Sequence, residues 1–229
     1  MKDKTLLGGL IFTGGGLLLI VLLWIFVLRD AQIASEPLTS IALETADPSA
    51  TLFEIVPAES RVEFQLREEL RGVPTTVVGF TSQVAGQIAL NPADLATAQV
   101  GVVRVNARTL QTDNDFRNTA IRNGILFTEQ YEYVSFAPTA VSSLPPSAAV
   151  GEEVTFAVSG DLTIAGETAP ATFAVTAVLA APTRLEGRAS ATIQRADFGL
   201  AIPEAPGVAN VDEAVRLEIL FVAVVRENP

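Results

Sequence analysis

A run of alternating apolar and polar residues between Gly151 and Ala181 limits the fold of this chain more than any other feature. Before the reversal at Ala165-Gly166-Glu167, the apolar positions are Val154, Phe156, Val158, Leu162 and Ile164. After it they are Ala171, Phe173, Val175, Ala177 and Leu179. A period of two is typical of β-strands, and glycine at the reversal favours a hairpin. We therefore predict two antiparallel strands with one apolar face.

Short β-branched runs, separated by Gly, Pro, Asn or Asp, continue this pattern on both sides of the hairpin. They predict strands over Leu52–Val56, Ser60–Glu68, Thr75–Leu90, Gln99–Leu110, Tyr131–Val141, Leu185–Phe198 and Ala214–Val224. Gly79 and Gly86 mark positions where the long third run can bend or bulge. About eight antiparallel strands fit one closed barrel whose interior holds a small ligand. A sheet-on-sheet sandwich is the alternative, because the two architectures share this pattern.

One segment between the predicted strands has a helical rather than a strand pattern. Phe116, Ala120 and Ile121 recur at helical intervals within Asp113–Ile125, and Asn123-Gly124 is a plausible helix stop. Asp113 is a good candidate for the N-cap. The fold class that we predict is therefore all-β, an antiparallel barrel with one short helix.

An uncharged stretch of 23 residues, Leu6–Leu28, precedes these elements. At about 1.5 Å per residue a helix of this length spans a bilayer core, whereas a cleaved signal peptide has an apolar core of only about 7–15 residues. We predict an uncleaved transmembrane anchor over residues 1–28, a flexible linker over 29–51 and a folded domain over 52–229. The glycines of the apolar stretch Leu6–Leu28 would also let two such helices approach closely, so a homodimer is possible.

The flanking charges predict which side of the membrane the domain occupies. Lys2 and Lys4 precede the apolar stretch and only Arg29 follows it closely. Because positive charge stays inside, the N-terminus is expected in the cytoplasm and the domain outside it, in the periplasm or at the cell surface.

Composition excludes several function classes. The chain has no Cys and no His, so His bases, Cys nucleophiles and most zinc or transition-metal sites are absent. From Arg29 onward 25 acidic residues face 13 arginines, a balance that repels nucleic acid. Only carboxylate or hydroxyl chemistry remains, and no carboxylate pair has a nucleophile beside it. We predict neither a catalytic nor a metal-binding residue, and a protein that is not an enzyme.

Several motifs resemble those of one protein family. The stretch Gly160–Ile164, followed by Gly166, Thr168 and Pro170, is similar to a motif of the YceI-like, or polyisoprenoid-binding, family of bacterial envelope proteins. Further stretches resemble the family in the expected order, namely Phe53–Phe64, Gly79–Ile88, Thr109–Arg117, Tyr131–Phe136 and Ile193–Leu200. The likeness spans Leu52–Val225.

The chain departs from the family pattern at four positions: Asn118 stands in place of Asp, Glu132 in place of Pro, and Glu68 and Ala165 where relatives often carry His. Polar contacts attributed to those positions in relatives therefore do not carry over to this chain.

The resemblance implies a lipocalin-like barrel with an apolar tunnel that holds a polyisoprenoid chain, such as an isoprenoid quinone or another prenyl lipid. Small residues on the hairpin, Ala171, Ala174, Val175 and Ala177, would leave volume along its axis. The residues expected to line the tunnel are Phe156, Val158, Phe173, Val175, Leu179, Ile219 and Phe221. Arg117 is the candidate for a head-group contact, because guanidinium suits phosphate or carbonyl oxygens. The alternative is a structural or interaction domain of the cell envelope whose core is filled by its own side chains.

Overall fold

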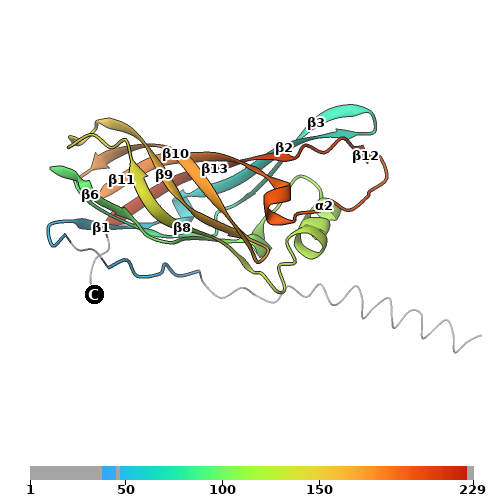
Figure 1. Ribbon diagram of the computed structural model, residues 1–229, viewed down its shortest axis with the longest axis horizontal. Helices are drawn as coiled ribbons and strands as arrows, with labels where there is room; N and C mark the ends of the chain where they lie inside the picture. Colours follow the sequence, from blue (N-terminus) through green and yellow to red (C-terminus); the bar gives the residue numbers. More distant parts are fainter. Residues whose placement is uncertain (1–37, 45–46, 226–229) are drawn as a thin grey trace, which may run out of the picture. The chain divides into compact units, whose positions relative to one another are not determined.

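Antiparallel strands make up most of the described residues in the computed structural model, which describes residues 38–44 and 47–225 (Figure 1). The predicted anchor, residues 1–28, and residues 29–37 of the predicted linker lie outside the described residues. Within the described ranges, no helix is long and apolar enough to cross a membrane.

The strands belong to one sheet whose main path runs β4-β7-β8-β9-β10-β11-β13-β1-β5-β6, with β2 pairing β13, β3 and β12. The strands are β1 (Thr51–Ile55), β2 (Arg61–Leu70), β3 (Val73–Thr81), β4 (Val84–Ala85), β5 (Gln87–Asn91), β6 (Asp94–Val100), β7 (Val103–Asn106), β8 (Tyr133–Ser142), β9 (Glu153–Ile164), β10 (Glu167–Ala181), β11 (Arg184–Gln194), β12 (Val208–Ala209) and β13 (Ala214–Val225). The short helices are η1 (Pro57–Glu59), η2 (Ala107–Thr109), α2 (Asp115–Ala120), η3 (Ile121–Ile125) and η4 (Arg195–Phe198).

The fold is all-β as predicted, but its strands form a half-barrel and are more finely divided than the predicted eight. The sheet has thirteen strands in the described part of the chain. The predicted run Thr75–Leu90 becomes β3, β4 and β5, interrupted after Thr81 and at Gly86, while Gly79 lies within β3. The alternation of apolar residues continues across such bends, so the sequence pattern does not reveal them. Figure 1 shows the long strands curving around one interior.

The predicted hairpin is confirmed as β9 and β10, which pair from Glu153–Val178 to Ile164–Glu167. The turn consists of Ala165 and Gly166, with φ of 50° and 86°. Two positive φ angles are the mark of the tight turn that matches strand twist. The predicted apolar face is buried or half-buried along both strands. Ala174 is an exception to the prediction, because it is exposed on the outer face.

The predicted helix is present as α2 and η3, which together cover residues 115–125. Its N-cap is Asn114 rather than Asp113, because the Asn114 side chain accepts a hydrogen bond from the Arg117 backbone N–H at 3.1 Å. Asp113 instead forms an ion pair with the Arg117 guanidinium. Asn and Asp are about equally good N-caps, so neighbouring candidates are not separated by residue type.

The described end of the predicted linker lies against the sheet, unlike a free tether. We call residues 38–44 and 47–50 the strap. The Leu43 N–H donates to the side-chain oxygen of Gln87, which is 1% exposed, at 2.7 Å. Further along, Thr97 donates to Asp47 at 2.9 Å, and the Asn91 amide donates to the Ser49 hydroxyl at 2.9 Å. Residues that precede the predicted boundary at Leu52 therefore make hydrogen bonds to the sheet.

Candidate ligand-binding cavity

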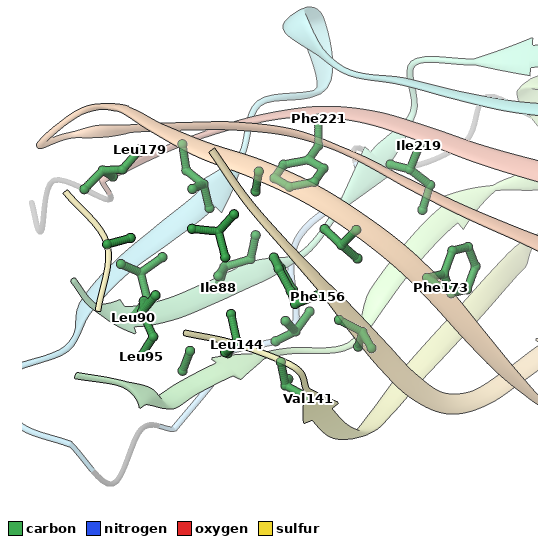
Figure 2. A pocket seen from close by; sticks show the side chains of 18 of the residues that line it. Ile88, Leu90, Leu95, Val141, Leu144, Phe156, Phe173, Leu179, Ile219 and Phe221 are labelled. Atoms are coloured by element: carbon green, nitrogen blue, oxygen red, sulfur yellow. The ribbon is translucent and has the colours of Figure 1, made fainter. Parts of the chain in front are cut away.

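An apolar cavity of about 130 Å³ lies inside the curved sheet. Its walls come from strands β1, β5, β6, β7, β8, β9, β10, β11 and β13, from Pro92 between β5 and β6, and from the loop between β8 and β9 (Figure 2). Figure 2 places Phe173 towards one end of the cavity and Leu90, Leu95 and Leu179 towards the other, with Phe156 and Phe221 between them.

All seven residues that the sequence nominates for the tunnel line this cavity. They are Phe156 and Val158 on β9, Phe173, Val175 and Leu179 on β10, and Ile219 and Phe221 on β13. Alternation along each strand turns these side chains to the interior and their polar neighbours to the outside. Phe156 and Ile219 are half-buried and the other five are buried. Their contact with a ligand is taken up below as a proposal.

Other lining residues were not nominated from the sequence. Ile88 and Leu90 on β5 and Leu95 and Ala98 on β6 form the facing wall. Ile88 and Leu90 lie within a predicted strand and alternate with polar or small residues, so the same periodicity argument would have found them. Leu144 and Ala148 lie in a proline-bearing loop without a period. Only the tertiary structure brings them to the cavity.

One aromatic contact packs the inner end of the cavity. The rings of Phe136 on β8 and Phe173 on β10 meet edge to face, with centroids 4.9 Å apart and planes at 65°. This arrangement is the favourable one for aromatic quadrupoles. Both side chains are buried. The wall at this end is therefore formed by two rings that hold each other in place.

The loop between β8 and β9, residues 143–152, covers the other end of the cavity. It is held by three backbone hydrogen bonds, from Leu95 N–H to Pro146 O at 2.9 Å, from Ala148 N–H to Pro92 O at 3.0 Å and from Gly151 N–H to Leu179 O at 2.9 Å. Glu152, the last residue of the loop, lines the cavity and is exposed. The cavity therefore reaches the protein surface beside Glu152, and we call this place the mouth.

The structure does not bring Arg117, the predicted head-group contact, to the cavity lining. Its guanidinium lies 2.9 Å from the Glu68 carboxylate and 2.6 Å from that of Asp113. The Glu68 side chain is only 8% exposed and that of Arg117 is 18% exposed. Arg117 thus compensates a buried carboxylate between β2 and α2, a structural use of its charge.

Arg195 lies in a short helix rather than on a strand, and its guanidinium pairs with Glu213 rather than with the nearby Asp197. Residues 195–198 form η4, because β11 ends at Gln194. The buried Arg195 guanidinium donates to the Glu213 carboxylate at 2.7 Å and to the carbonyl oxygens of Asp212 and Leu200 at 2.9 Å each. Arg195 therefore joins η4 to the chain that leads into β13.

Among the described residues, the charged groups whose pKa values are displaced are not lining residues of the cavity. Hydrogen bonds from Ser49 and Thr97 lower the pKa of the Asp47 carboxyl. A hydrogen bond from Arg184 lowers the pKa of Glu59, and the same pairing raises that of Arg184. Across the described residues, no group of three or more acidic, His or Cys side chains is arranged to hold a metal ion.

Comparison with known proteins identifies a family and a fold. The family model described as YceI-like domain matches residues 53–223. No curated protein matches the chain.

Solved structures with a similar fold include BcnA from Burkholderia cenocepacia, at 20% identity and a TM-score of 0.57, covering 74% of this chain and 99% of that one. A polyisoprenoid binding domain from Saccharophagus degradans, implicated in plant cell wall breakdown, has 16% identity and a TM-score of 0.57, covering 77% and 99%. A YceI protein from Campylobacter jejuni has 13% identity and a TM-score of 0.50, covering 99% and 100%. At these identities the likeness is one of fold.

Proposed function

Because the chain belongs to the YceI-like family, we propose that it binds an isoprenoid lipid, a polyisoprenoid or an isoprenoid quinone, with the lipid chain in the apolar cavity. The observation that carries this proposal is the cavity wall, which is hydrocarbon except for Glu152 at the mouth. The solved domain from Saccharophagus degradans, described as polyisoprenoid binding, supports the same class of ligand.

The chemistry of the wall favours a chain without polar atoms. Each CH₂ group moved from water into such a site contributes about 0.8 kcal/mol. A polar group in the same place would lose its hydrogen bonds to water and find no partner, at a cost of roughly 1–3 kcal/mol. An isoprenoid tail is hydrocarbon along its whole length, so it gains from burial in the cavity and brings no polar group that would lose hydrogen bonds. We propose a binding role for this site rather than a catalytic one.

The volume of the cavity sets how much of a chain it admits in this state. A volume of about 130 Å³ is close to that of an engineered cavity of roughly 150 Å³ that binds benzene. The cavity as it stands thus suits a group the size of one isoprene unit, and a longer chain requires it to widen. We propose that Phe156, Leu144 and Ala148 shift to widen it, because these lining residues are only half-buried.

We also propose that residues 1–28 anchor the protein in a membrane, with the folded domain outside the cytoplasm. The support is the uncharged stretch Leu6–Leu28 and the lysines that precede it. Such an anchor would tether the folded domain to a membrane.

Filling the cavity tests the binding proposal. Ala177 is buried and lines the cavity, whereas Ala174, three residues earlier on β10, is exposed on the outer face. We expect delipidated full-length protein to bind tritiated geranylgeraniol in equilibrium dialysis, in a bulky steroid detergent. Ala177→Phe should weaken this binding at least about tenfold, because the added ring removes volume that the chain needs. Ala174→Phe should bind like the wild type.

Equal binding by the wild type and the Ala177→Phe variant would place the lipid elsewhere. Absence of binding by wild type would favour the alternative, a domain with a self-filled core. Circular dichroism of both variants establishes that each is folded.

A further inference from the structure

The wall of the cavity carries a single charge, and it is negative. Glu152 is the one charged side chain among the described residues that line the cavity. It immediately precedes β9 and is exposed at the mouth. One of its carboxylate oxygens accepts a hydrogen bond from the Ala149 N–H at 2.9 Å, which holds the side chain against its own loop. A lipid whose tail lies inside the cavity would have its head group beside this carboxylate.

An arginine that adjoins the cavity lining in the sequence is already paired with two other carboxylates. Arg184 precedes the lining residue Leu185, at the start of β11. Its guanidinium donates to the Glu59 carboxylate at 2.7 Å and to that of Glu186 at 2.6 Å. Two carboxylates thus share one cation, and the raised pKa of Arg184 and the lowered pKa of Glu59 have the same cause. A phosphate at the mouth would have to compete with both carboxylates for this cation.

The charge of the whole protein acts in the same direction. The formal net charge is −11, and a prenyl phosphate would bring roughly 1.5 to 2 further negative charges to a mouth that already holds a carboxylate. A hydroxyl head group brings no charge and donates a hydrogen bond that a carboxylate accepts well.

We infer that the cavity selects isoprenoid lipids with an uncharged head group, of which a prenyl alcohol is the simplest, over prenyl phosphates. Glu152 at the mouth is the specificity-determining residue. This inference rests on the proposed function, because it concerns the head group of the lipid whose chain the cavity holds.

The test compares two lipids with the same tail. The dissociation constants of geranylgeraniol and geranylgeranyl phosphate are measured for the full chain at low ionic strength. We expect the alcohol to bind about tenfold more tightly to the wild type, given the strength of charge repulsion at a few ångströms near a protein surface. Glu152→Gln keeps the hydrogen-bond acceptor and removes the charge, and should reduce this preference about fivefold.

Glu153→Gln is the matched control. Glu153 is the next residue, is exposed and does not line the cavity. The Glu153→Gln variant changes the net charge of the protein by the same amount as Glu152→Gln. Because Glu153 does not line the cavity, this variant should leave the preference for the alcohol nearly unchanged. In 0.5 M salt the preference of the wild type should shrink, because the repulsion is screened.

Three outcomes are distinguishable from the expected one. Phosphate binding to the wild type as tight as that of the alcohol would overturn the inference while leaving the proposed function intact. An equal effect of Glu152→Gln and Glu153→Gln would overturn the role of Glu152. Binding of neither lipid to the wild type would contradict the proposed function itself, and the inference with it.

Discussion

At the scale of the residue, Arg195 is the one arginine that is buried among the described residues. Its side chain is 10% exposed, and its guanidinium satisfies two carbonyl oxygens and the Glu213 carboxylate. We expect Arg195→Gln to destabilise the protein by about 2 kcal/mol, because the shorter side chain loses the three hydrogen bonds that the buried guanidinium makes. Urea unfolding followed by circular dichroism gives the change in the free energy of unfolding.

Arg188→Gln is the control for the loss of an arginine. The Arg188 side chain is 59% exposed and pairs with Glu218 at 3.3 Å. Arg188 is itself exposed and Glu218 keeps a second partner in Arg216 at 3.4 Å, so we expect a change below about 0.5 kcal/mol. Similar costs for the two variants would show that the buried hydrogen bonds of Arg195 are not what stabilises η4.

At the scale of the element, the strap depends on a carboxylate. Asp47 accepts hydrogen bonds from the Ser49 N–H at 2.8 Å, the Ser49 hydroxyl at 2.6 Å and the Thr97 hydroxyl at 2.9 Å. These bonds lower the pKa of Asp47 below its ordinary value of 3.8, with the Ser49 hydroxyl the largest cause. Because the folded pKa is depressed, the contribution of Asp47 is fully present above about pH 4 and is lost as the pH falls through the lower folded value.

This linkage predicts how Asp47→Asn changes the response to acid. The variant should be less stable than the wild type at pH 7, and the difference should shrink below about pH 4. Unfolding measured in urea from pH 7 to pH 2.5 checks this. Ser49→Ala should raise the pKa of Asp47 in carbon-detected NMR, since it removes the main donor. A difference in stability that stays constant down to pH 2.5 would mean that the Asp47 carboxylate does not fasten the strap.

The elements show which parts of the structure follow from local pattern. The hairpin of β9 and β10 was predictable because its signals are local in the sequence. Apolar residues alternate along each strand, and Gly166 lies at the turn between them. Alternation along the last strand also predicted Ile219 and Phe221 of β13 as lining residues, because side chains two positions apart lie on the same face of a strand.

Features that depend on distant partners were out of reach of such reasoning. The partner of Arg195 is Glu213, 18 positions away, and not the nearby Asp197. Leu144 reaches the cavity through a loop whose backbone bonds to Pro92, between β5 and β6, and to Leu95 on β6. The division of a long apolar run into β3, β4 and β5 likewise reflects pairing with different strands, β2, β7 and β1.

At the scale of the whole molecule, the half-barrel places an apolar interior behind an acidic surface. The hydrophobic core, together with the partly buried side chains packed against it, includes most of the cavity wall, so the residues that hold the fold together are also those proposed to contact the lipid. A substitution that enlarges the cavity at Phe173 would therefore lower stability and alter binding together. Filling the cavity at Ala177 separates the two effects, which is why that variant carries the binding test.

The most direct measurement of the central claim is mass spectrometry of the lipid that accompanies the full-length protein from its own cells. We expect organic extraction of the purified wild type to release an isoprenoid lipid with an uncharged head group, close to one molecule per chain, and the Ala177→Phe variant to release far less. A wild-type preparation that releases no isoprenoid, or the same amount as the filled variant, would contradict the account.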